Sequence, residues 1–182
     1  MKLIAFDFDG TLIEGRLIGA LARKFGFESE LGPLLEEEKF PRYEQSLKIS
    51  HLLKGIKIEE VEEVARELPL IPGARETLEE LERRDYTIDI VSDSYKQGID
   101  AAMEKLPVDL IHANELIVNH GSLTGNIRMP LGWAKPVGCL KHSVCKLNAL
   151  LEAAKRTGIN VKDTVAVGNG RIDACMLEVA GL

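Results

Sequence analysis

The sequence is poor in the features that mark secreted and membrane-spanning proteins. It has three cysteines in 182 residues, and no two of them form a CxxC pair. An odd, small number of cysteines favours a reduced, cytoplasmic protein over one stabilised by disulfides. No uninterrupted apolar run approaches the roughly 20 residues that a membrane span requires. The N-terminal residues also lack the shape of a signal peptide.

Basic residues are also fewer than acidic residues. The 23 Lys and Arg residues are outnumbered by 29 Asp and Glu residues, which gives a formal net charge of −6. This balance disfavours nucleic acid or an anionic membrane as a partner, because both attract basic patches. Hydrophobic residues at 45% and charged residues at 29% are typical of a globular chain, long enough here for one ordinary domain.

Short apolar runs alternate with amphipathic segments along most of the chain. Strands are expected at residues 3–6, 86–91, 110–112 and 164–167, and a hairpin at 114–127. Helices are expected at residues 74–84, 97–106, 142–157 and 172–180. Strand alternating with helix predicts an α/β fold with a doubly wound, mostly parallel, Rossmann-like sheet.

Residues 14–71 follow a different pattern. Leu17, Leu21 and Phe25 recur at helical spacing before Gly26, and two further amphipathic helices follow. This stretch contains no good strand. We therefore expect an α-helical cap at 14–71, inserted after the first strand of a core formed by residues 1–13 and 72–182.

The strongest local signal is the run DFDGTL at residues 7–12, directly after the first apolar strand. It places two carboxylates, Asp7 and Asp9, where open α/β sheets bind ligands. Neighbouring carboxylates repel each other unless a cation or a shared proton compensates, and Mg²⁺ is the natural oxygen-bound cation. Gly10 lets the chain turn and exposes backbone N–H groups to an anion.

This run resembles the DxDGT signature of the haloacid dehalogenase superfamily, and three further segments follow in that family's order. Ser92 ends a strand, Lys146 opens a helix, and VGNGRID at residues 167–173 resembles the motif GDGxND. The resemblance covers nearly the whole chain. The helical insertion is similar to the cap of the phosphoserine phosphatase branch.

The resemblance implies a Mg²⁺-dependent phosphatase acting on a small phosphorylated metabolite. Asp7 is then the nucleophile that forms an aspartyl phosphate, and Asp9 is the general acid and base. Lys146 pairs with both Asp7 and the phosphate.

Further residues receive binding roles from the same resemblance. Gly10, Thr11 and Ser92 are expected to hold the phosphate. Asp7, the backbone carbonyl of Asp9, and Asn169 would bind Mg²⁺. Asp173 is expected to anchor either the metal or the lysine.

The sequence departs from the family pattern at several of these sites. Asn169 stands where the family usually carries an aspartate, which should weaken Mg²⁺ binding. Ile172 replaces an asparagine. Asp93 replaces a glycine next to Ser92, where it repels phosphate unless it turns away or binds a cation.

Two departures in the cap concern the substrate. Arg16 takes the position of a glutamate that reads an ammonium group, and Ser50 that of an arginine that reads a carboxylate. We therefore expect an enzyme that is not specific for phosphoserine. Arg16 suits an additional anionic group on the substrate, or alternatively an exposed salt bridge.

Other interpretations remain open from the sequence. A catalytically weakened member could bind a phosphorylated ligand or a protein partner, or the phosphoryl group could pass to an acceptor other than water. Cys139, His142 and Cys145 carry the donors of a metal site, although a fourth ligand is not evident.

Overall fold

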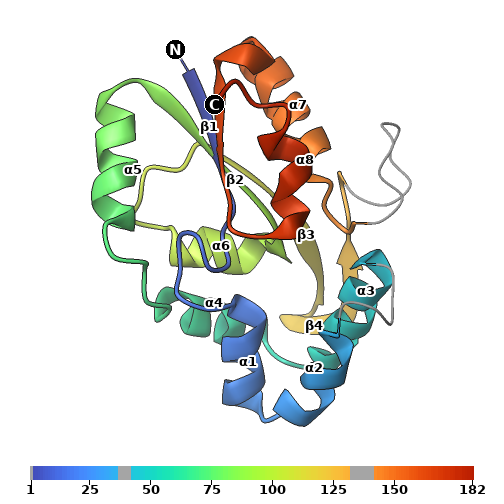
Figure 1. Cartoon of the computed structure of the whole chain (residues 1–182). Coiled ribbons are helices and arrows are strands. Elements are labelled where there is room, and N and C mark those ends of the chain that lie inside the picture. The colour runs from blue at the N-terminus through green and yellow to red at the C-terminus, as the bar shows by residue number, and fades with distance from the viewer. Residues whose placement is uncertain (1, 37–41, 132–141) are drawn as a thin grey trace.

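A five-stranded sheet forms the centre of the protein (Figure 1). The structure is a computed structural model and describes residues 2–36, 42–131 and 142–182. The strand order is β4-β3-β2-β1-β5. The parallel strands are β1 (Lys2–Phe6), β2 (Tyr86–Tyr95), β3 (Leu110–Asn119) and β5 (Thr164–Val167), and β4 (Ser122–Arg128) runs antiparallel to β3.

Helices cover both faces of this sheet. Side chains alternate along β1, so Ile4 and Phe6 join one hydrophobic cluster while Leu3 and Ala5 join the other. The first cluster includes residues of α5 (Ala74–Arg83) and α6 (Lys96–Ala102). The second includes residues of α7 (Lys146–Thr157) and α8 (Ala174–Leu177). The predicted α/β fold with a doubly wound, mostly parallel sheet is confirmed.

The helices that the structure describes within residues 14–71, the segment we call the cap, lie together at one end of the sheet (Figure 1). Helix α1 buries Leu17 and Leu21 completely. It ends at Gly26, whose φ of 74° lies in the left-handed region that glycine adopts without strain. The cap helices are α1 (Leu17–Phe25), α2 (Glu28–Leu34), α3 (Arg42–Leu52) and α4 (Ile58–Arg66).

The cap is joined to the core through polar contacts of α3. The Ser50 hydroxyl lies 3.0 Å from the carbonyl oxygen of Gly125 in β4. The Ser46 hydroxyl donates to Ser143 Oγ at 2.9 Å, and Asn114 Nδ2 donates to the same oxygen at 3.1 Å. These bonds join α3 to β4 and to the residues just before α7.

Several predicted boundaries are wrong, for identifiable reasons. Strand β2 continues to Tyr95, because its polar end resumes pairing with Asn114 of β3 after a register shift. The separate strands predicted at 110–112 and 114–118 form the single strand β3. Helix α7 begins at Lys146, four residues later than predicted. No helix in the described ranges is long and apolar enough to cross a membrane.

Candidate active site

The site lies where the carboxyl ends of three parallel strands meet. Strand β1 is paired with β2 on one side and β5 on the other, and Phe6 lies opposite both Ile90 and Val167. The residues that follow these positions therefore reach the same edge of the sheet. This brings Asp7 close to residues from the ends of β2 and β5.

A buried lysine connects two carboxylates at this edge. Lys146 Nζ lies 2.6 Å from Asp7 Oδ1 and also contacts Asp173 Oδ1. Lys146 is 1% exposed, Asp7 4% and Asp173 0%. Burial raises the pKa of Asp7, although Lys146 partly opposes this effect. Burial alone would lower the pKa of Lys146, but the nearby carboxylates, Asp7 first among them, outweigh it and raise that pKa.

The position of Lys146 is unfavourable without these partners. It is the first residue of α7, where the positive end of the helix dipole repels a cation. Asp173 accepts bonds at both carboxylate oxygens, from Lys146 and from the backbone N–H of Gly170 at 2.7 Å. Asp173 therefore holds Lys146 against Asp7.

Asp9 links the first strand to the cap. Its Oδ1 accepts a hydrogen bond from the backbone N–H of Leu17, at the start of α1, at 2.9 Å. Burial raises the pKa of Asp9 to about 7, although the bond from Leu17 lowers it. A carboxyl group with this pKa is available in both protonation states near neutral pH, as general acid–base catalysis requires.

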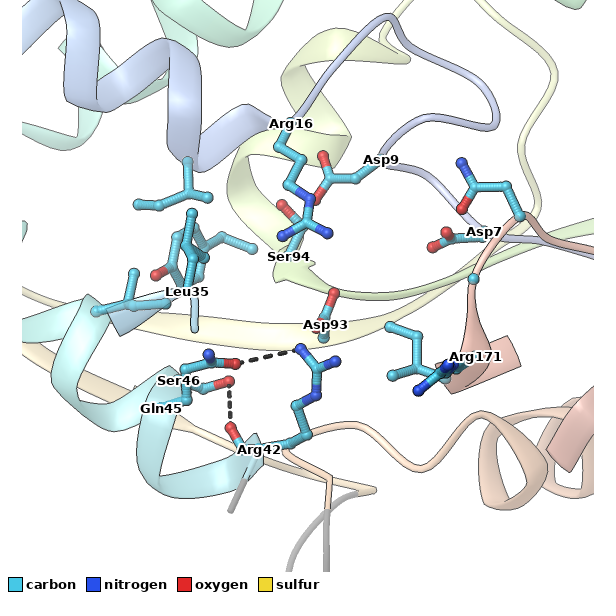
Figure 2. Close-up of a pocket in the computed structure, with 16 residues that line it drawn as sticks. Asp7, Asp9, Arg16, Leu35, Arg42, Gln45, Ser46, Asp93, Ser94 and Arg171 are labelled. Carbon is cyan, nitrogen blue, oxygen red and sulfur yellow. Dashed lines mark hydrogen bonds between the residues drawn. The ribbon is translucent and has the colours of Figure 1, made fainter. Parts of the chain in front are cut away.

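These residues face a cavity of about 110 Å³ between the cap and the core (Figure 2). One water needs roughly 10–15 Å³ by the same measure, so the space suits a small molecule. Its lining is formed by Asp7, Asp9, Asp93, Ser94, Tyr95, Asn169, Gly170, Arg171 and Ile172 of the core and by Arg16, Ile18, Leu35, Arg42, Gln45, Ser46 and Ile49 of the cap.

Three of the predicted phosphate-binding residues lie outside the cavity lining. Ser92 is fully buried, and its Oγ accepts a hydrogen bond from the backbone N–H of Ser94 at 3.1 Å. The Thr11 hydroxyl is buried and has no hydrogen-bond partner among the described residues. Gly10 has a φ of 77°, and a Cβ there would lie 2.4 Å from Asn169 Nδ2. The left-handed backbone at this position favours glycine, and a side chain there would also displace the Asn169 amide.

Asn169 has an orientation that suits an amide rather than a carboxylate. Its Nδ2 donates to the carbonyl oxygen of Gly10 at 2.7 Å, which leaves its Oδ1 as an acceptor. No described residue donates a hydrogen bond to the carbonyl oxygen of Asp9. The Asp7 carboxylate, the carbonyl oxygen of Asp9 and Oδ1 of Asn169 are therefore oxygen donors that suit a hard cation such as Mg²⁺.

The metal-ligand fit depends on Asn169 and a backbone carbonyl. The described residues contain no group of three or more His, Cys, Asp or Glu side chains that could hold a metal ion. Asp173 has both oxygens engaged and is absent from the cavity lining. The possible metal site with Cys139 falls partly outside the described residues.

Several residues of the cavity were not predicted from the sequence. Arg42 and Gln45 come from the start of α3, Arg171 from the loop after β5, and Ser94 from the end of β2. Arg171 occupies the variable position of the fourth motif, and Ser94 follows the second motif by two residues. Only their nearness to recognisable motifs could have indicated a role.

Comparison with known proteins identifies the family of the chain. The family model for haloacid dehalogenase-like hydrolases matches residues 4–178. A phosphoserine phosphatase from Methanocaldococcus jannaschii is 39% identical to this chain, and the match covers 100% of this chain and 83% of that protein. One from Archaeoglobus fulgidus is 32% identical, and this chain spans 51% of its length.

A solved structure has the same fold. The phospho-aspartyl intermediate analogue of a phosphoserine phosphatase superposes with a TM-score of 0.82 at 37% identity, covering 100% of this chain and 84% of that one. The chain is therefore a phosphatase-type member of the haloacid dehalogenase-like hydrolase family, in the branch that resembles phosphoserine phosphatases.

Proposed function

We propose that the protein hydrolyses a small phosphate monoester through an aspartyl phosphate on Asp7, with Mg²⁺ as its cofactor. The observation that carries this proposal is the placement of Asp7 in the cavity wall, 2.6 Å from the buried Lys146 and beside Asp9. A carboxylate held by a buried lysine can meet the negative charge of a phosphate without repelling it.

In the first half-reaction, an Asp7 oxygen attacks phosphorus and the bond to the ester oxygen breaks. Asp9 gives its proton to the leaving alkoxide, which departs as an alcohol. In the second, Asp9 takes a proton from the attacking water, and the acyl phosphate opens to inorganic phosphate and free Asp7. The pKa of about 7 for Asp9 suits both transfers.

Lys146 and Asp173 act together in this scheme. Lys146 neutralises charge on Asp7 and on the incoming phosphate, while Asp173 keeps the lysine in place. The predicted metal role of Asp173 thus becomes a positioning role in our proposal. Asp7, the Asp9 carbonyl and Asn169 would hold Mg²⁺, which supplies further neutralisation of the phosphoryl oxygens.

We also propose that the enzyme is not specific for phosphoserine. Arg16 lines the cavity, where its charge disfavours an ammonium group. Ser50 is fully buried outside that lining and lies within hydrogen-bond distance of the Leu47 and Gly125 carbonyl oxygens. Neither position therefore offers the charge that would read phosphoserine in the related enzymes.

The test is hydrolysis of nitrophenyl phosphate with and without Mg²⁺. We expect metal-dependent turnover that Asp7→Asn abolishes, because an amide is not a nucleophile. Asp163→Asn, at an exposed position in the short helix before β5, is the matched control and should keep full activity. Activity of Asp7→Asn within about tenfold of the wild type would overturn the proposed role of Asp7.

A further inference from the structure

A bulge near the end of β2 forms part of the cavity wall. The regular pairing of β2 with β3 is interrupted at residues 92–94 and resumes where Tyr95 lies opposite Asn114. Two residues of this bulge, Asp93 and Ser94, line the cavity. The conformation of the bulge therefore sets where two side chains of the site lie.

The side chain of Asn114 fixes one peptide group of this bulge. Asn114 Nδ2 donates a hydrogen bond to the carbonyl oxygen of Asp93 at 2.7 Å. The N–H of the same peptide group belongs to Ser94 and donates to Ser92 Oγ at 3.1 Å. Because both ends of the peptide group are bonded, it cannot rotate without losing a hydrogen bond. Asn114 therefore helps to hold Asp93 and Ser94 in the cavity wall.

The same amide nitrogen is connected to the cap. An amide nitrogen carries two hydrogens, and the second bond of Asn114 Nδ2 is to Ser143 Oγ at 3.1 Å. Ser143 Oγ lies 2.9 Å from Oγ of Ser46, which belongs to α3 of the cap and lines the cavity. Asn114 is 0% exposed and Ser143 is 1% exposed. A buried series of hydrogen bonds therefore joins the bulge of β2 to the cap.

The oxygen of the Asn114 side chain has no comparable partner. Asn114 Oδ1 is buried and receives no hydrogen bond from the described residues. A buried acceptor without a donor destabilises the fold. A hydrophobic side chain would avoid this cost, but it would leave Asp93 and Ser143 without their donor. The two bonds made by Nδ2 therefore explain an asparagine at this position better than packing does.

We propose that Asn114 is a positioning residue that couples the position of the cap to the conformation of the bulge at residues 92–94. The inference rests on the proposed phosphatase function and adds a residue to it. Asn114 does not line the cavity, so it acts through Asp93 on one side and Ser143 on the other. A cap that is held less firmly spends less time in the arrangement that binds substrate, which raises KM.

Single variants interrupt the series at three points. Ser46→Ala and Ser143→Ala remove the bond to the cap but keep the bond to Asp93, so each should raise KM for nitrophenyl phosphate about threefold to tenfold with little change in kcat. Asn114→Ala also frees the Asp93 peptide group, so kcat should fall as well, by about tenfold or more. Asn126→Ala is the control, because Asn126 is exposed on β4 and its side chain bonds within its own strand. Its kcat and KM should match those of the wild type.

Double variants distinguish a connected series from residues that act independently. Ser46→Ala should raise KM by less in the Asn114→Ala background than in the wild type, and it should have almost no effect in the Ser143→Ala background. An equal rise of KM in the wild-type and Asn114→Ala backgrounds overturns the inference, because it leaves Asn114 with a purely structural role. Values of kcat and KM for Asn114→Ala that match the wild type also overturn it. If Asn114→Ala does not fold, Asn114→Ser takes its place, because the shorter side chain cannot reach both partners.

An inactive wild-type protein would contradict the proposed function but would still allow this inference to be tested. The same double variants are then compared by urea unfolding. Losses in the free energy of unfolding that are smaller together than the sum of the single losses support the coupling of Ser46 to Asn114. Additive losses overturn it.

Discussion

Replacing Lys146 with methionine should destabilise the protein more as the pH rises. The substitution keeps the length of the side chain but removes the cation that lies 2.6 Å from Asp7 and also contacts Asp173. Both carboxylates are almost fully buried, so each loses a partner that water cannot replace. Breaking a buried ion pair in this way costs about 3–5 kcal/mol.

The pH dependence follows from the same geometry. Without the lysine, nothing offsets the burial and the nearby Asp173 charge that raise the pKa of Asp7, so the folded variant holds a proton on Asp7 that its unfolded chain releases. A group whose pKa is raised in the folded state stabilises the fold at low pH, and this stabilisation is lost as the pH rises. For one proton, the free energy of unfolding falls by up to about 1.4 kcal/mol for each pH unit. Between about pH 5.5 and 7.5, the cost should therefore grow by as much as about 2.7 kcal/mol.

Urea unfolding in the presence of a chelator measures this cost in the absence of metal. Asp173→Asn in the Lys146→Met background should recover part of the lost free energy of unfolding, because it removes one of the two charges. Lys155→Met, at an exposed position on the same helix, should change that free energy by less than about 0.5 kcal/mol. A cost for Lys146→Met below about 1 kcal/mol at both pH values would refute the reasoning.

Three further predictions concern other residues. With an alkyl phosphate, kcat should fall above about pH 7, because Asp9 loses the proton that the leaving alkoxide needs. With nitrophenyl phosphate, whose leaving group needs no proton, kcat should not fall in this range. Equal pH profiles of kcat for the two substrates would count against Asp9 as the acid. Asn169→Asp should raise Mg²⁺ affinity in a metal titration but lower metal-free stability by about 1 kcal/mol, because the bond to Gly10 is lost. An unchanged Mg²⁺ affinity would mean that this position is not a ligand. Asp89→Ala should lower the free energy of unfolding in urea by about 1–3 kcal/mol, because His112 Nδ1 loses its buried partner, which lies 2.9 Å away. An unchanged free energy of unfolding would contradict this prediction.

The strand and helix order could be predicted because local pattern and tertiary structure agree for most elements. The apolar run at β1 is buried on both faces, and β5 begins and ends as expected. The end of β2 could not be predicted, because its residues are polar and only pairing with β3 makes them a strand. Pairing of this kind depends on distant residues, which local periodicity does not report.

The candidate site was predicted where its residues belong to ordered motifs. Asp7, Asp9 and Asn169 line the cavity, and Lys146 contacts Asp7. The cavity arginines at 42 and 171 could not be predicted, because an arginine near a helix start or in a loop is usually solvated. Their role depends on how the cap sits over the core, which the sequence pattern does not encode.

The most direct test of the account is detection of the phosphorylated enzyme. The protein is mixed with a phosphate ester and Mg²⁺, quenched in acid, digested and analysed by mass spectrometry. We expect one added phosphoryl group on the peptide that contains Asp7, its loss in Asp7→Asn, and no modification at Asp93 in the same cavity. Turnover without any phosphorylated peptide, or phosphorylation that persists in Asp7→Asn, would contradict the central claim.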